Sequence, residues 1–205
     1  MGKITLTPLQ KSLFEQITND PSFPKTFYFT GGTALSAFYF HHRESEDLDF
    51  FSEKPFDTEI IADIMNKVSL AMGVPLRITR YEKVKIFEFV KNEKLLIKVD
   101  FVHHPYKRLE KGMQFGNTEI DSLIDIATNK LLTVNQRTEV KDFVDLYFLL
   151  EKFTIWDLFY GLKVKYNMEF DMVLLAADFL KAKDFDFLPK MVNPLSLDTL
   201  KAFFR

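Results

Sequence analysis

The strongest constraint on the fold is a change of pattern along the chain. Strand and helix patterns alternate in the first half, and helix patterns alone fill the second. Short β-branched and aromatic runs predict strands at 26–29, 47–51, 76–81, 84–90 and 95–102, the last two joined as a hairpin at 91–94. Helices are expected at 8–18, 34–39, 57–72, 123–135, 140–152, 155–166, 170–181 and from 196 onward. We therefore expect an α+β fold: a mixed β-sheet with flanking helices over residues 1–115, and a helical bundle over residues 116–205 packed on it.

The composition excludes several classes of protein. The 205 residues include 27 Lys and Arg against 29 Asp and Glu, so the formal net charge of -2 provides no general field for holding a polyanion. The absence of cysteine excludes disulfides, a thiolate nucleophile and cysteine-ligated metals. No membrane span or signal-peptide pattern is visible, so we expect a cytoplasmic protein without a membrane partner.

A glycine turn between the first predicted strand and the next helix is the first candidate functional feature. Gly31, Gly32 and Thr33 bring backbone N–H groups and a hydroxyl to the start of a helix, where anions bind. Glycine pairs also serve ordinary turns, so these residues alone are equally compatible with a structural role.

The second predicted strand carries two acids on one face. Side chains alternate along a strand, so Asp47 and Asp49 point the same way, with their Cα atoms about 7 Å apart. Two carboxylates beside a phosphate-binding turn can share a divalent cation such as Mg²⁺, although a solvated strand face gives the same pattern. Asp100, which shares a face with Lys98, adds a third acid if its strand pairs with 47–51. Three such acids can hold two metal ions for an in-line displacement at phosphorus.

The helical half adds cations and further acids. Lys130 and Arg137 lie seven residues apart, on one face of a predicted helix. Asp142 and Asp145 fall on the polar side of the next helix. Any amphipathic helix carries such residues, but together they supply cations for triphosphate charge and acids that orient those cations.

These residues resemble the motifs of a known family, the AbiEii/AbiGii toxin family of nucleotidyltransferases. The first motif is similar in Gly31-Gly32-Thr33-Ala34-Leu35, Arg43, Ser45 and Asp47-Leu48-Asp49-Phe50. The later motifs follow in the family's order as Lys98-Val99-Asp100, Asn129-Lys130-Leu131 with Arg137, and Lys141-Asp142-Phe143-Val144-Asp145-Leu146. The resemblance implies a nucleotidyltransferase fold of the polymerase-β type with a helical C-terminal part. For many members it also implies a toxin–antitoxin or phage-abortive role with an antitoxin encoded nearby.

The resemblance also implies roles for individual residues. It makes Asp47 and Asp49 catalytic ligands of Mg²⁺ or Mn²⁺ and Asp100 a third metal ligand. It assigns nucleotide binding to Gly31, Gly32, Thr33, Arg43, Ser45 and Lys130. Lys130 is also expected to be catalytic as a phosphate contact, and Asp142 as a base or an orienting group. Glu44 and Glu46 are a departure from the family pattern that puts catalytic efficiency in doubt.

The implied reaction is metal-dependent transfer of a nucleoside monophosphate from an NTP to a hydroxyl of RNA, tRNA included, or of a protein. Two alternatives stay open: a non-catalytic module of the same fold that binds NTP or a partner, and a metal-dependent phosphohydrolase. The basic stretch 77–98 is the best RNA-facing surface, although charged strands also prevent edge pairing. The pairs His41-His42 and His103-His104 are expected at the surface, with His104 near the rim of the site.

Overall fold

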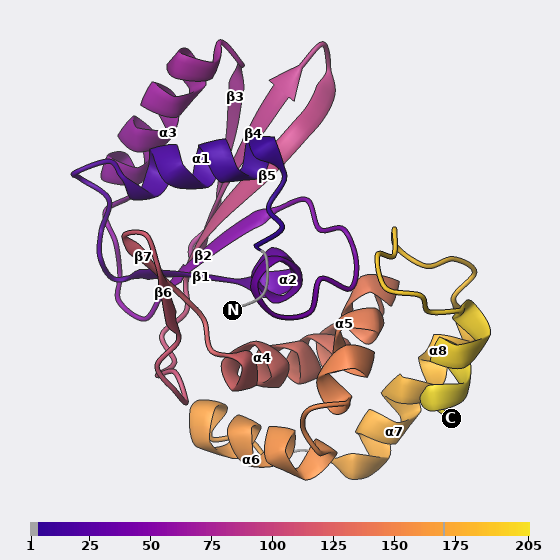
Figure 1. The fold of residues 1–205 in the computed structure, drawn as a ribbon. Coiled ribbons are helices and arrows are strands. Elements are labelled where there is room, and N and C mark those ends of the chain that lie inside the picture. The colour runs from indigo at the N-terminus through magenta and orange to yellow at the C-terminus, as the bar shows by residue number, and fades with distance from the viewer. Residues whose placement is uncertain (1–3, 170) are drawn as a thin grey trace.

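The structure, a computed structural model, describes residues 4–169 and 171–205 (Figure 1). Its first elements are α1 (Pro8–Thr18), β1 (Phe27–Thr30), α2 (Gly31–Ala34), the π-helix η1 (Leu35–Phe40), β2 (Leu48–Ser52), α3 (Thr58–Met72), β3 (Leu76–Arg80), β4 (Val84–Lys91) and β5 (Lys94–His103). They are followed by β6 (Met113–Phe115), β7 (Thr118–Ile120), α4 (Leu123–Gln136), α5 (Val140–Leu150), α6 (Ile155–Tyr166), α7 (Met172–Leu180), the 3-10 helix η2 (Lys181–Asp184) and α8 (Leu197–Phe203). The predicted first residue of the helix at 170–181, Phe170, lies outside the described residues.

Seven strands form one mixed sheet in the order β3-β4-β5-β2-β1-β7-β6, which confirms the expected fold class. The predicted hairpin is present: β4 and β5 pair antiparallel, and Asn92 and Glu93 have the positive φ values that tight hairpin turns need. β2 pairs parallel with β5, as the third-acid hypothesis requires. The strands β6 and β7 were not predicted, because three residues are too few to show alternation. β6 ends at residue 115, where the sheet half was expected to end, and β7 follows it. The sheet therefore extends to Ile120.

The two faces of the sheet have different roles. In Figure 1, α1 and α3 lie together on one side, while α4 to α8 gather on the other. The α1 side is an aromatic core, in which the buried ring of Phe50 lies 5.7 Å from that of Phe14 and 5.3 Å from that of Phe101. Residues of β2 and β5 that alternate with this core point toward α4. None of the helices in the described ranges has the length and apolar character needed to cross a membrane.

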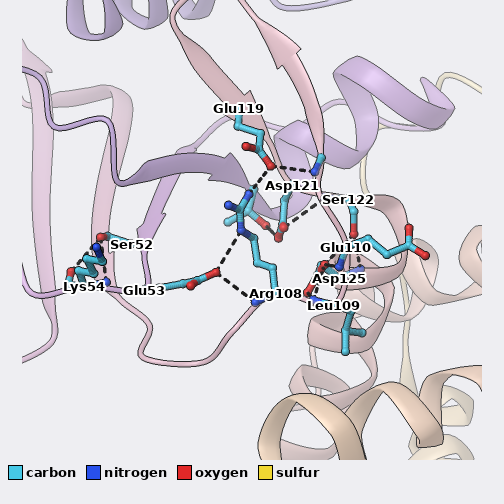
Figure 2. A network of polar contacts seen from close by, with 12 residues as sticks. Ser52, Glu53, Lys54, Arg108, Leu109, Glu110, Glu119, Asp121, Ser122 and Asp125 are labelled. Carbon is cyan, nitrogen blue, oxygen red and sulfur yellow. Dashed lines mark hydrogen bonds and ion pairs between the residues drawn. The ribbon is translucent and has the colours of Figure 1, made fainter.

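A polar network fastens the sheet to the helical half (Figure 2). Arg108 pairs with Glu53 and Glu119 at 3.3 and 2.6 Å, and its guanidinium lies 4.4 Å from the centroid of the Tyr28 ring. Asp125, at the start of α4, accepts hydrogen bonds from the backbone N–H groups that follow Arg108, those of Leu109 and Glu110. The segment that follows β5 is therefore attached to the sheet through Arg108 and to α4 through Asp125.

Asp125 also forms a fully buried ion pair with Lys165 of α6, at 2.6 Å. Replacing Lys165 by Met leaves this carboxylate without its counter-charge, so we expect the free energy of unfolding to fall by about 3–5 kcal/mol. Lys163→Met is the control, because Lys163 lies on the same helix but is exposed; it should change the value by less than about 0.5 kcal/mol. Urea denaturation followed by circular dichroism measures both. Equal stability of the two variants would contradict the role given to the Lys165–Asp125 pair.

Asp121, beside this network, predicts a pH dependence of stability. Burial raises its pKa to about 7, against the opposing effect of Lys165. Between about pH 4 and 7 the native state therefore keeps a proton that the unfolded chain releases, and stability falls as pH rises through this window. Asp121→Asn removes this contribution, so its unfolding free energy should fall less between pH 5 and 7.5 than that of the parent protein. Identical pH profiles in urea titrations would disprove this.

Candidate active site

A cavity of about 430 Å³ opens between the sheet and α4. The strand side is lined by Asp47, Asp49, Phe51, Lys98, Asp100, Val102 and His104. The helix side is lined by Ile126, Asn129, Lys130, Leu132, Thr133, Gln136, Arg137, Lys141 and Tyr166, and the turn side by Thr30, Gly31, Gly32, Arg43 and Ser45. Most of the residues selected from the sequence therefore meet in one cavity.

Three acids of this cavity lie close together because of strand register. β2 and β5 pair in parallel with Asp49 opposite Asp100, and Asp47 is two residues before Asp49 on the same face. Burial, together with the neighbouring carboxylates of Asp100 and Asp47, raises the pKa of Asp49 to about 7. Burial also raises the pKa of Asp100. A nearby cation would therefore favour the ionised forms of Asp49 and Asp100.

Lys98 supplies a cation to these acids. Its ammonium lies 2.7 Å from Oδ2 of Asp100 and 3.5 Å from Oδ2 of Asp47. Oδ1 of Asp100 is buried and has no hydrogen-bond partner among the described residues. Within the same described ranges, no group of three or more acidic, histidine or cysteine side chains is already arranged to hold a metal ion. Lys98 is therefore the cation that faces Asp100 and Asp47 in this structure.

The glycine turn is needed because other side chains approach it closely. Gly31 has a φ of +78°, and a Cβ there would collide with the carboxylate of Asp49. A Cβ at Gly32 would lie 2.5 Å from Nη2 of Arg43. The helix expected at 34–39 begins earlier, at Gly31, and continues as the π-helix η1.

Thr33 and Ser45 hold the acid-bearing segment in place. The Thr33 hydroxyl donates to the backbone carbonyl of Asp47 at 2.5 Å and lies 2.9 Å from Oγ of Ser45. Thr33 is buried and is not among the described residues that line the cavity, whereas Ser45 does line it. Thr33 thus positions the segment that leads to Asp47 instead of facing a ligand in the cavity.

Asp145, on α5, is a fully buried carboxylate that gathers three side chains from distant parts of the sequence. Arg43 donates to both of its oxygens, at 2.7 and 2.8 Å, and Nε2 of His42 lies 2.8 Å from Oδ1. The Lys130 ammonium lies 2.6 Å from Oδ2. Burial alone would raise the pKa of Asp145, but Lys130 and Arg43 hold it well below its usual range.

The prediction of His42 at the surface was wrong. His42 is fully buried, because its ring contacts the Asp145 carboxylate. Asp145 is itself buried and does not lie on a solvated helix face.

Asp142 joins the two cations that were predicted to share a helix face. Its Oδ1 accepts from Lys130 and its Oδ2 from Nε of Arg137, both at 2.8 Å. Although burial opposes this effect, Lys130 and Arg137 lower the pKa of Asp142. Because both oxygens are engaged and the carboxyl stays ionised, the geometry favours an orienting group over a base.

The cavity also contains residues to which sequence reasoning gave no role. Oη of Tyr166 donates to Oδ1 of Asn129 at 2.7 Å and lies 3.2 Å from Nε2 of His104. His104 was expected near the rim and lines the cavity. Nothing in the sequence indicated a role for Tyr166 in the site, because aromatic residues near helix ends are common. In the basic stretch, Arg77 pairs with Glu88 and Arg80 with Glu59, so part of its charge is neutralised locally.

The Asp145 cluster gives a direct prediction. Asp145→Asn keeps the size of the side chain but leaves Arg43 and Lys130 buried without their shared counter-charge. We expect the free energy of unfolding to fall by about 3–5 kcal/mol, measured by urea denaturation. Glu151→Gln makes the same chemical change at an exposed position on the C-terminal end of α5, and should cost less than about 0.5 kcal/mol. A loss of similar size in both variants would mean that Asp145 has no special role.

Comparisons with known proteins place this site in a family. An uncharacterized protein of Aquifex aeolicus is 35% identical over 156 residues, which cover 73% of this chain and 66%, just under two thirds, of that protein. Among solved structures, JHP933 from Helicobacter pylori has a TM-score of 0.60 at 20% identity, covering 98% of this chain and 90% of that one. MenT4, a nucleotidyltransferase toxin from Mycobacterium tuberculosis, has a TM-score of 0.61 at 18% identity, covering 96% and 79%. These two likenesses show a shared fold.

The sequence profile of a family matches residues 12–201, which is most of the chain. That family is described as the nucleotidyl transferase AbiEii toxin of type IV toxin–antitoxin systems. The match includes every residue of the cavity described above. The chain therefore belongs to the AbiEii family of nucleotidyltransferase toxins.

Proposed function

We propose that this protein is a metal-dependent nucleotidyltransferase that moves a nucleoside monophosphate from an NTP to a hydroxyl of RNA, tRNA included, or of a protein. The observation that carries this proposal is one cavity in which three acids, a tight glycine turn and a fixed lysine meet. Family membership supports a biological role as the toxin of a toxin–antitoxin or abortive-infection system, with an antitoxin as its partner. A cytoplasmic location, where NTPs and RNA are available, is part of this proposal.

Asp47, Asp49 and Asp100 fit Mg²⁺ or Mn²⁺ by the chemistry of their donors. All three are carboxylates, which hard divalent cations prefer, and the buried Oδ1 of Asp100 has no partner within the described ranges. The raised pKa of Asp49 also favours a nearby cation. When bound, the metal would neutralise triphosphate charge and polarise the reacting phosphoryl group.

Lys130 is the cation that we assign to the phosphates. An ammonium has three N–H donors, and Asp142 and Asp145 take two of them, which leaves one for a ligand in the cavity. Two buried carboxylates also fix its position, so no reorganisation is needed when negative charge develops. The absence of side chains at Gly31 and Gly32 leaves room for the Asp49 carboxylate and the Arg43 guanidinium, which face the same cavity as Lys130. Catalysis by these residues consists of positioning and charge stabilisation.

Asp49→Asn should lower the transfer rate by at least about 10²-fold, because it removes a charge from the metal site at nearly constant size. Asp47→Asn should act in the same way. The assay measures label from α-³²P NTPs in total cellular RNA and protein, with circular dichroism to check the fold. Asp63→Asn is the control, because it makes the same chemical change at an exposed position of α3 that does not line the cavity. Full activity in either Asp variant would contradict the assignment.

Calorimetry with NTP and Mg²⁺, together with an assay of pyrophosphate release and of the labelled products, separates the two alternative functions. NTP binding without pyrophosphate release would indicate a binding module, and free nucleotide without labelled macromolecule would indicate a phosphohydrolase. Label in RNA or in protein identifies the acceptor class.

A further inference from the structure

The cavity changes its chemistry along the strands. On β2 the face that lines it passes from Asp49 to Phe51, and on β5 it passes from Asp100 to Val102 and then to His104, the residue after the strand. Each step of two residues advances about 7 Å. The charged groups therefore lie at one end of the cavity, and apolar and aromatic groups lie at the other.

The helix wall follows the same order. Lys130 of α4 and Arg137, the residue that follows the helix, contact Asp142 at the charged end. Asn129 contacts Tyr166, which in turn lies against His104 at the aromatic end. A nucleoside triphosphate has this sequence of chemistry, three phosphates followed by a flat base, and a volume of about 430 Å³ is within the usual range for ligand pockets.

We propose that the aromatic end of the cavity binds the base of the NTP, and that the side-chain amide of Asn129 reads a hydrogen-bond acceptor on the edge of that base. This inference rests on the proposed nucleotidyltransferase function and extends it to the recognition of the nucleotide.

The orientation of the Asn129 amide is fixed by a chain of hydrogen bonds. The single proton of the Tyr166 hydroxyl goes to Oδ1 of Asn129, so the hydroxyl oxygen accepts from Nε2–H of His104. Burial lowers the pKa of His104 to about 4, so the imidazole is neutral at physiological pH and carries one ring proton. With Oδ1 engaged, Nδ2 of Asn129 keeps two donors that have no partner among the described residues. A base whose edge carries a carbonyl oxygen or a ring nitrogen acceptor satisfies them.

The surrounding surface suits a flat ring. Phe51 packs beside His104 with ring centroids 5.2 Å apart, and Tyr166 lies 5.8 Å from His104. Val102 and Ile126 complete the apolar lining. Burying a base against such groups is favourable, and an unmet donor in this setting penalises a ligand that lacks the acceptor.

The test compares NTPs with ribose 5-triphosphate, which lacks the base, by calorimetry in the presence of Mg²⁺. We expect the parent protein to bind at least one NTP about tenfold more tightly than ribose 5-triphosphate. Asn129→Leu has a similar size and no donor, and should reduce this preference severalfold while leaving ribose 5-triphosphate binding within about twofold. Tyr166→Phe should reduce the preference, because the amide is no longer held in one orientation.

Asn117→Leu is the matched control, because Asn117 is exposed in the turn between β6 and β7 and should leave both affinities unchanged. An equal loss of affinity for both ligands in Asn129→Leu, or an unchanged NTP preference, overturns the inference. A parent protein that binds ribose 5-triphosphate as tightly as every NTP overturns the inference alone. A parent protein that binds no triphosphate overturns the proposed function and the inference together.

Discussion

The geometry of the site depends on one buried carboxylate, that of Asp145. It joins His42 and Arg43, which follow the π-helix, to Lys130 of α4, and so connects the sheet half of the chain to the helical half. Taking these charges out of water is costly, and the cost is offset only while all partners keep their places. Because Lys130 and Arg43 both line the cavity, this connection between the two halves also fixes the positions of two residues of the site.

Strand register supplies the second constraint. Parallel pairing of β2 with β5 sets Asp49 opposite Asp100, and antiparallel pairing of β1 with β2 sets Thr30, the last residue before the glycine turn, opposite Asp49. A shift of one residue in either pairing would turn the acids into the aromatic core. The polar network around Arg108 and Asp125 then holds the segment after β5 against α4.

The sequence revealed the parts of this molecule that are periodic or local. The longer strands, the hairpin at Asn92 and the acids on one face follow from alternation, and the family motifs brought Lys130 and Asp142 into the site. His42 was misplaced because the partner that buries it, Asp145, lies 103 residues away in the sequence. The role of Tyr166 likewise depends on a distant residue of another helix, Asn129. Such long-range pairings leave no local pattern for sequence reasoning to find.

The alternation of the strands also relates the core to the chemistry. Asp49 lies between Leu48 and Phe50, and Asp100 between Val99 and Phe101, and all four apolar neighbours are fully buried. The rings of Phe14, Phe50 and Phe101, three of the chain's 23 phenylalanines, pack in series behind the acids. A substitution that loosens this aromatic layer shifts the strand backbone, and the carboxylates move with it. Substitutions that loosen this layer are therefore expected to lower activity and thermal stability together, even though no residue of the layer is among the described residues that line the cavity.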